Sequence, residues 1–337
     1  MDGWVNVAEV WRGDFLECVH RGRAVVCDSR GQVIAAWGDV EDVVLPRSSC
    51  KMLQALPLIE SGAAAHFGLN SEHLALSCAS HQAAAIHTDR VTRWLTDLEL
   101  GEPDLRCGPQ VPSDPAARDA LVKSGCLHDK RHNNCSGKHS GFLTLNKFLK
   151  GNAEYVMPDH PVQKMALAAF EEMTGEVSPG HVIDGCSAPN FATSLKGLAT
   201  AMARMADPSG LGEARQNAAT SLVAAMKKHP DLVAGETRAC TDLMRAMAGP
   251  TVVKTGAEGV FVAILPERGL GVAVKIQDGA TRASQNLMAS ILVRLGVAEA
   301  ENPLVQKYLK PTLTNFAGLD VGYIKPSPSF FDNAARI

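Results

Sequence analysis

The sequence predicts an α+β protein in which an antiparallel sheet of about five strands, built from both chain ends, is flanked by helices and interrupted by a mostly helical insertion. Three observations predict this class. Segments with an apolar period of two residues lie only near the two ends of the chain. The long middle part repeats its apolar residues at helical spacing instead. The chain has 337 residues, 46% of them hydrophobic, which is enough for one large domain or two closely associated domains.

Two short strands are predicted near the start of the chain. Residues 23–28 and 32–38 are rich in Val, Ile and Ala, and the Ser-Arg-Gly between them is typical of a hairpin turn. Pro46 disfavours helix at the residue before it, so the first helix is expected only beyond that point. Apolar side chains then recur at helical spacing from residue 49 to residue 60.

The middle and the end of the chain differ in their apolar period. Further helices are expected at residues 71–76, 88–98, 115–123, 142–149, 161–173, 194–205, 212–228, 240–247 and 281–295. A period of two returns near the end and predicts strands at residues 251–255, 259–265 and 271–276. The chain from residue 311 onward is expected to be irregular.

This distribution predicts two domains. Residues 1–45 and 250–337 would form the sheet domain, and residues 46–249 would form a helical domain inserted into it. A nucleophile on the first helix of the insertion would then lie at the interface of the two domains, where small-molecule sites commonly occur.

Composition argues against several classes of function. The net charge of −3 disfavours nucleic acid or an anionic membrane as a partner, and no apolar run is long enough to span a membrane. The first residues lack the apolar segment of a signal peptide. The nine cysteines are irregularly spaced without a C-x-x-C pair, which favours a reduced, cytoplasmic protein. Five of them are expected to be small buried apolar residues: Cys18, Cys27, Cys107, Cys126 and Cys240.

The first chemical motif consists of Ser48 and Lys51. If a helix begins at Ser48, both side chains lie on one face, one turn apart. A lysine held neutral by desolvation or by a nearby cation can take the proton of a serine and make it nucleophilic. This S-x-x-K spacing is that of penicillin-binding proteins and serine β-lactamases. The same residues also fit a helix start in which Ser48 or Ser49 caps the backbone and Lys51 is solvated.

The second motif is Lys254-Thr255-Gly256 on a predicted strand, the K-T-G element that accompanies S-x-x-K in the β-lactamase group. Lys254 alone also fits a solvated lysine on an edge strand. Facing a cleft, it would assist a second serine or act as the cation beside Lys51. Ser80, in Cys-Ala-Ser-His, is the nearest match to the middle element of that group, although it is not Ser-Asp-Asn.

The third group combines two cysteines with nitrogen donors. Cys135 and Cys186 offer thiolates, and Lys138 and His139 follow the first of them closely. Such soft donors suit zinc, although the spacing is not that of a zinc finger. The residues therefore fit either two buried cysteines in tight loops or a zinc site with one open position. Asp184 stands beside Cys186. From the residues alone His139 is the expected nitrogen ligand, because a lysine must bind metal as its neutral amine.

Taken in order, these motifs resemble the zinc-binding, rhizobial-type L-asparaginases, the class 3 or asparaginase II family. The resemblance spans nearly the whole chain. It is carried by residues 47–51 (Arg-Ser-Ser-Cys-Lys), 78–81 (Cys-Ala-Ser-His), 134–139 (Asn-Cys-Ser-Gly-Lys-His), 184–186 (Asp-Gly-Cys), 243–246 (Leu-Met-Arg-Ala), 254–257 (Lys-Thr-Gly-Ala) and 274–279 (Val-Lys-Ile-Gln-Asp-Gly).

The resemblance implies a serine β-lactamase-like fold, a homodimer, and hydrolysis of L-asparagine to L-aspartate and ammonia. It implies two Ser–Lys pairs, Ser48 with Lys51 and Ser80 with Lys254. Arg47 would contact the substrate, where its guanidinium is suited to bind the α-carboxylate in a bidentate fork.

The resemblance also implies one zinc ion per chain. Its ligands would be Cys135, Lys138 and Cys186, so the family favours Lys138 over His139 as the nitrogen donor. Asp184 would support the ligands from behind. His139 would become a substrate contact instead.

In the expected mechanism Lys51 takes the proton of Ser48, and Ser48 attacks the side-chain amide carbon. Backbone N–H groups stabilise the oxyanion, ammonia leaves, and water hydrolyses the acyl-enzyme. Ser80 and Lys254 would relay protons or activate that water. The zinc ion would orient the substrate, because a thiolate-rich coordination sphere makes it a weak Lewis acid.

Three alternatives compete with this reading. A glutaminase or another small-amide amidohydrolase could use the same scaffold, because one methylene separates the two substrates. A penicillin-binding or β-lactamase activity is disfavoured by the missing Ser-Asp-Asn element. The third alternative is a zinc-binding protein without catalytic turnover.

Overall fold

The structure is a computed structural model that describes residues 3–332. The chain divides into two compact units, which we call the sheet unit and the helical unit. The sheet unit comprises Met1–Ser49, Thr193–Asp207 and Asp242–Ile337, and the helical unit comprises Cys50–Ala192 and Pro208–Thr241.

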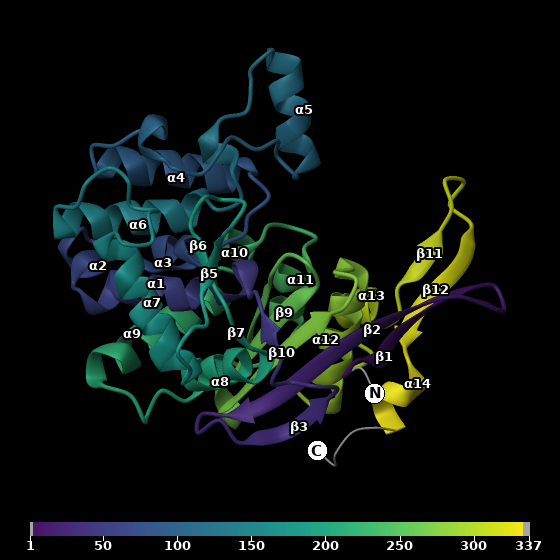
Figure 1. The fold of residues 1–337 in the computed structure, drawn as a ribbon. Coiled ribbons are helices and arrows are strands. Elements are labelled where there is room, and N and C mark those ends of the chain that lie inside the picture. The colour runs from purple at the N-terminus through teal and green to yellow at the C-terminus, as the bar shows by residue number, and fades with distance from the viewer. Residues whose placement is uncertain (1–2, 333–337) are drawn as a thin grey trace. The chain divides into compact units, whose positions relative to one another are not determined.

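One antiparallel sheet of eight strands forms the sheet unit. Its order is β11-β12-β1-β2-β10-β9-β8, with β3 paired to β2, so strands from the two chain ends lie side by side (Figure 1). This confirms the predicted α+β class with an antiparallel sheet from both ends. The strands are β1 (Val5–Arg12), β2 (Phe15–Asp28), β3 (Val33–Trp37), β8 (Val252–Thr255), β9 (Val260–Leu265), β10 (Leu270–Ile276), β11 (Thr312–Thr314) and β12 (Asp320–Pro326).

Apolar side chains hold the centre of this sheet together. Val272 of β10 lies opposite Val26 of β2 and Ala263 of β9, and all three are fully buried. Helix α8 (Leu195–Ala206) packs on β2, β9 and β10. It approaches so closely that a Cβ on Gly271 would lie 2.2 Å from backbone atoms of α8. Only glycine fits this close approach of a helix to a strand.

The other helices of the sheet unit are those that follow β10 and part of α11, which precedes β8. Helix α12 packs on β1, β9, β10 and β12, and α14 packs on β1. Helix α11 crosses the boundary between the two units. A short two-stranded sheet joins β4 to β7. These elements are α11 (Ala239–Ala246), α12 (Thr281–Arg294), α13 (Pro303–Leu309), α14 (Pro328–Asp332), β4 (Val43–Val44) and β7 (Thr193–Ser194).

The sheet is wider than predicted, because three of its strands carry a weak apolar signal. In β1 the pairing register shifts between Asn6 and Ala8, which interrupts the two-residue period. β12 buries only Ile324 fully, and the exposed β11 has three residues. Both strands are held by backbone pairing along one edge of the sheet. The expectation of an irregular chain from residue 311 onward was therefore wrong as far as residue 332, and residues 333–337 lie outside the described part of the chain.

The helical unit consists mainly of helices, whereas α8, which falls within the predicted insertion, belongs to the sheet unit. Most starts and ends agree within three residues, but α6 begins six residues before the expected 142. A hairpin of β5 (His181–Ile183) and β6 (Pro189–Phe191) was not predicted. The helices are α1 (Lys51–Glu60), α2 (Ala63–His66), α3 (Ser71–Ser77), α4 (Ala85–Asp97), α5 (Pro115–Ser124), α6 (Ser136–Leu149), α7 (Pro161–Thr174), α9 (Glu213–Lys228) and α10 (Pro230–Val233).

All nine cysteines are free thiols. Cys27, Cys107 and Cys240 are buried as expected. Cys126 is exposed and Cys18 is half-buried, so the prediction was wrong for these two. Cys126 follows α5, a helix without a buried residue, and a small apolar residue there has no core to join.

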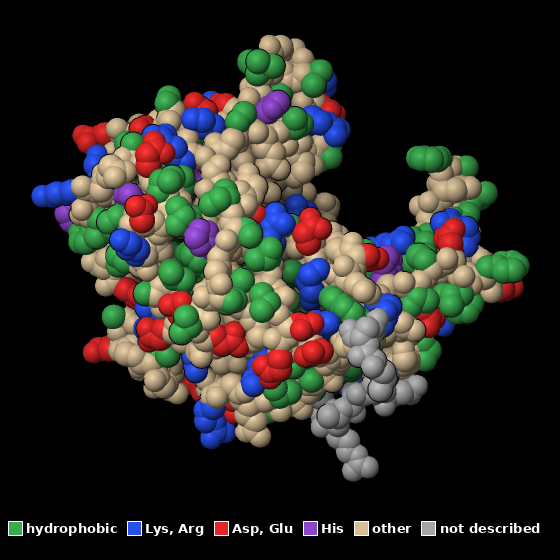
Figure 2. Space-filling view, viewed as in Figure 1, with side chains coloured by type: hydrophobic (Ala, Val, Ile, Leu, Met, Phe, Trp, Pro, Cys, Tyr) green, Lys and Arg blue, Asp and Glu red, His purple; other side chains and the backbone are tan. Residues whose placement is uncertain are grey.

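The described part of the chain contains no helix long and apolar enough to cross a membrane. On the face drawn in Figure 2, acidic and basic side chains are interspersed without a large region of one sign. This pattern agrees with the small net charge of the sequence.

Candidate active site

Lys51 is the centre of a buried polar cluster in the helical unit. It is the first residue of α1, and only 1% of it is exposed. Its amine donates to the Ala79 carbonyl and lies 3.0 Å from the Ser80 hydroxyl and 3.1 Å from the Cys135 sulfur. An amine at this distance from a hydroxyl is within reach for proton transfer.

Two glycines on α6 let Cys135, at the start of that helix, lie close to Lys51 and Ser80. A Cβ on Gly137 would lie 2.5 Å from the Leu76 carbonyl oxygen, and one on Gly141 would lie 3.2 Å from Ser77 Cβ. One turn apart, the two glycines let α6 pack directly against α3. Cys135 is the N-cap of α6 and therefore lies near the segment that follows α3, where Ser80 is found.

Cys186 and Lys138 form a close sulfur–nitrogen contact. The Lys138 amine donates to the Cys186 sulfur at 2.9 Å, and both side chains are buried. A hydrogen bond from the Cys135 thiol, followed by the charge of Lys138, lowers the pKa of Cys186 despite burial. The same hydrogen bond and burial raise the pKa of Cys135. These opposite shifts make Cys186 the more acidic thiol of the pair.

Burial acts to lower the pKa of Lys138, but the two sulfurs and Asp184 outweigh it and raise that pKa above its usual value. Lys138 thus holds its proton more tightly than a lysine in water. It would have to lose this proton before it could bind a metal ion.

Tyr155 fixes the ring of His139 from behind. Its hydroxyl accepts a hydrogen bond from the Arg106 backbone N–H at 2.9 Å and lies 2.8 Å from His139 Nδ1. The hydroxyl proton then goes to Nδ1, because the reverse arrangement would leave a fully buried O–H without an acceptor. The other ring nitrogen, Nε2, therefore carries the proton. It is buried and makes no hydrogen bond with the described residues.

The position of the His139 proton helps to decide between His139 and Lys138 as the nitrogen ligand of a metal ion. His139 Nε2 carries a proton, so the neutral ring offers a hydrogen-bond donor there rather than a lone pair. Burial lowers the pKa of His139, and the neighbouring Cys186 sulfur opposes this effect. The geometry thus favours a hydrogen-bonding role for His139.

The loop that carries Cys186 is a tight turn between β5 and β6. Asp184 N–H donates to the Ala188 carbonyl, and Ser187 N–H donates to the Asp184 carbonyl. Ser187 has a φ of 71°, which is uncommon for a residue with a side chain. The turn holds Cys186 against Lys138 from a second chain segment.

The donor set of Cys135, Lys138 and Cys186 fits zinc by its chemistry. Two sulfurs and one amine meet in a buried cluster, and thiolate and neutral nitrogen are the donors that zinc prefers. Among residues 3–332, no group of three or more His, Cys, Asp and Glu side chains converges as a metal site. A zinc ion in this cluster would therefore depend on the Lys138 amine.

Arg47, Ser48 and Lys254 belong to the sheet unit. Ser48 lies in a short 3-10 helix, Arg47–Cys50, that leads directly into α1. The N-cap of α1 is Cys50, and no described side chain caps this helix, so Ser48 and Ser49 are not its caps. The Ser49 hydroxyl donates to the Pro46 carbonyl at 2.7 Å.

Lys254 is 1% exposed, and its amine donates to the Thr255 carbonyl at 2.8 Å. It is therefore not a solvated lysine. Each expected Ser–Lys pair has one member in each unit. The pairs Ser48–Lys51 and Ser80–Lys254 thus stay predictions, and the contact between Lys51 and Ser80 was not predicted.

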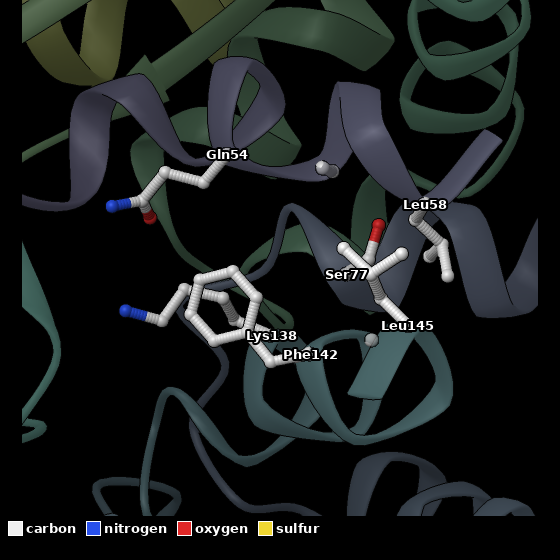
Figure 3. Close-up of a pocket in the computed structure, with 8 residues that line it drawn as sticks. Gln54, Leu58, Ser77, Lys138, Phe142 and Leu145 are labelled. Carbon is white, nitrogen blue, oxygen red and sulfur yellow. The ribbon is translucent and has the colours of Figure 1, made fainter. Parts of the chain in front are cut away.

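A small cavity in the helical unit lies beside Lys138. Its volume is about 10 Å³, room for roughly one water molecule. Figure 3 shows that the polar ends of Gln54 and Lys138 point the same way, while Phe142, Leu58 and Leu145 form apolar walls. The cavity is too small for an amino acid.

A family model described as L-asparaginase II matches residues 8–326. The chain belongs to the L-asparaginase II family. Membership in this family indicates an amidohydrolase. No curated protein sequence matches the chain.

Several solved structures resemble this L-asparaginase II family member at low identity. A β-lactamase from Mycobacterium bovis has 14% identity and a TM-score of 0.43, over 81% of this chain and 94% of that one. A putative β-lactamase from Bacteroides dorei has 12% identity and a TM-score of 0.46, over 81% and 93%. A Bacillus glutaminase has 12% identity and a TM-score of 0.38, over 82% and 91%.

Tyr155 is the functional candidate that sequence reasoning missed. It stands outside every motif, in a loop between α6 and α7, and no spacing relates it to His139. The sequence offered only the residue type as an indication, because a buried tyrosine needs a hydrogen-bond partner for its hydroxyl.

Proposed function

We propose that this member of the family hydrolyses L-asparagine to L-aspartate and ammonia through a serine activated by a buried lysine. The observation that carries the proposal is the Lys51 amine, buried and 3.0 Å from a serine hydroxyl. The Lys51 amine contacts a hydroxyl and a thiol away from solvent, and such an arrangement is suited to proton transfer.

Ser48 is the proposed nucleophile and Lys51 is its base. Ser48 Oγ attacks the side-chain amide carbon, its proton passes to Lys51, and the tetrahedral intermediate expels ammonia with a proton returned through Lys51. Water then attacks the acyl-enzyme and releases L-aspartate. In this scheme Ser80 and Lys254 carry protons to and from that water. Support for Ser48 comes from the family motif and from its freedom from a capping role.

Ser80 is the second candidate for the nucleophile. The contact with Lys51 favours it, since this hydroxyl already has the amine as its neighbour. In the first scheme the same contact lets Ser80 relay protons to Lys51. The two assignments differ in which serine becomes acylated.

We also propose one zinc ion per chain, held by Cys135, Lys138 and Cys186, with Asp184 supporting the site. Zinc when bound would supply a positive charge that helps to orient the substrate. His139 would donate from Nε2 to a substrate oxygen.

We further propose that the protein is a cytoplasmic homodimer. Light scattering on the purified protein tests whether it is a dimer.

The decisive experiment measures ammonia release from L-asparagine and L-glutamine, with zinc measured on the same sample. Faster turnover of L-asparagine supports the proposal, and faster turnover of L-glutamine would make the protein a glutaminase. Zinc without any turnover would leave only a metal-binding protein.

The nucleophile is tested with Ser48→Ala, Ser80→Ala and the exposed control Ser124→Ala. Loss of activity in Ser48→Ala with a smaller loss in Ser80→Ala supports Ser48, because Ser80 only relays protons in that scheme. Full activity in Ser48→Ala together with loss in Ser80→Ala would transfer the role to Ser80. The control is expected to keep both activity and stability.

A further inference from the structure

The turn after the K-T-G element brings a carboxylate next to Arg47. Gly256 makes this possible, because a Cβ there would lie 2.6 Å from the Pro46 carbonyl oxygen and 3.3 Å from Ser49 Cβ. The turn at Gly256 therefore packs directly against the backbone of residues 46–49 in the sheet unit. Glu258 follows two residues later, and its Oε1 lies 4.0 Å from Arg47 Nη1.

Both members of this ion pair have an unusual backbone. The φ angles are 54° for Arg47 and 56° for Glu258, in the left-handed region that favours glycine. Such conformations persist where the surroundings enforce them, and they are concentrated at functional sites. Here two of them place one cation and one anion side by side.

The Glu258 carboxylate is located by its neighbours yet open to solvent. The Lys275 amine donates to the Glu258 carbonyl at 2.7 Å, which fixes the backbone. The carboxylate lies against Gly279, where a Cβ would be 2.9 Å from Oε2. Its side chain is 69% exposed. At 4.0 Å the contact with Arg47 is longer than a hydrogen bond, so the carboxylate can still accept from a ligand.

This inference rests on the proposed function, in which Arg47 binds the α-carboxylate of the substrate. An α-amino acid carries its ammonium group on the same carbon as that carboxylate, so the group would come close to Glu258. We infer that Glu258 binds the α-ammonium group and that the site selects free α-amino acid amides. A carboxylate ligand without the ammonium group would meet the negative charge of Glu258 uncompensated.

The test compares L-asparagine with succinamate, which has the same carboxylate and amide but lacks the amino group. In Glu258→Gln we expect kcat/KM for L-asparagine to fall about 10- to 100-fold, the effect of losing a hydrogen bond to a charged group. We expect kcat/KM for succinamate to stay the same or to rise. Glu301→Gln, an exposed control on the same unit, is expected to change neither.

Binding of L-aspartate and succinate, measured by calorimetry, gives a readout that needs no turnover. The natural protein is expected to bind L-aspartate more tightly, and Glu258→Gln is expected to lose that preference. Equal losses for both amides, or an unchanged preference in binding, would overturn the inference. Absence of hydrolysis with the preference intact would contradict the proposed function and leave the ammonium subsite supported.

Discussion

The two lysines expected to act as bases are equally buried but differ in their surroundings. Lys51 and Lys254 are each 1% exposed. In the helical unit the Lys51 amine contacts a hydroxyl and a thiol, both of which exchange protons. In the sheet unit the Lys254 amine donates to the Thr255 carbonyl, among its contacts. A buried amine needs polar partners, and the hydroxyl and the thiol beside Lys51 support its proposed role as the base.

The largest effect is expected from removing Lys51. Lys51→Met should lower kcat by about 10²- to 10⁴-fold, the usual contribution of a general base. Lys254→Met should lower kcat less, because Lys254 is not the base proposed for Ser48. Steady-state kinetics on both variants checks the order. A greater loss of kcat in Lys254→Met than in Lys51→Met would make Lys254 the base instead.

Cys135→Ala is expected to release the metal. The variant lacks one of three proposed ligands, so its zinc content should fall well below one per chain, and KM should rise more than kcat falls. Metal analysis after dialysis provides the measurement, with Cys240→Ala as a buried control outside the cluster. Unchanged zinc in Cys135→Ala would show that the ligands are different residues.

Gly137→Ala tests how the cluster is assembled. The added Cβ would lie 2.5 Å from the Leu76 carbonyl oxygen, so α3 and α6 must separate. We expect a loss of about 1–3 kcal/mol in the free energy of unfolding. Gly108→Ala is the control, because its Cβ would meet no atom within 4 Å. Equal stability of the two variants in urea would refute the close approach.

Tyr155→Phe removes the hydroxyl that fixes His139. It leaves the Arg106 N–H and His139 Nδ1 without a partner, at a cost of about 1–3 kcal/mol in stability. Nitrogen NMR of the histidines should show the His139 proton on Nε2 in the natural protein and a mixture of both ring forms in the variant. A proton on Nδ1 in the natural protein would disprove the assignment.

The smallest effect concerns acid stability in the helical unit. His81 and His87 stack with ring centres 4.9 Å apart, and burial lowers the pKa of both below the usual 6.5. Unfolding restores that value, so the unfolded chain binds more protons below about pH 6.5. Stability should therefore fall as pH drops through this range and be insensitive to these groups above it. Each ring contributes at most about 1.4 kcal/mol per pH unit.

Urea unfolding at pH 5.5 and 7.5 measures this slope. In His87→Gln the slope should be smaller, because a titrating group is gone. The same slope in the variant and the natural protein would mean that other groups, such as carboxylates, account for the acid sensitivity.

The helices and central strands could be predicted because they are rich in apolar residues that become buried. β10 and α1 are examples, since β10 is buried on both faces and α1 buries all of residues 51–58. β12, which lies beside the edge strand β11, could not be predicted, because backbone pairing holds it. In the helical unit the structure brings Cys135, Lys138 and Cys186 together, and their role as metal ligands stays a prediction. The Lys51–Ser80 contact and the role of Tyr155 depend on tertiary packing that no spacing encodes.

Intact-mass spectrometry and peptide mapping of the protein, quenched during turnover of L-asparagine, test the central claim most directly. The account predicts an aspartyl ester on Ser48 that disappears in Ser48→Ala and accumulates when the water-activating step is slowed by Lys254→Met. Full turnover with no acylated serine under any of these conditions would contradict it.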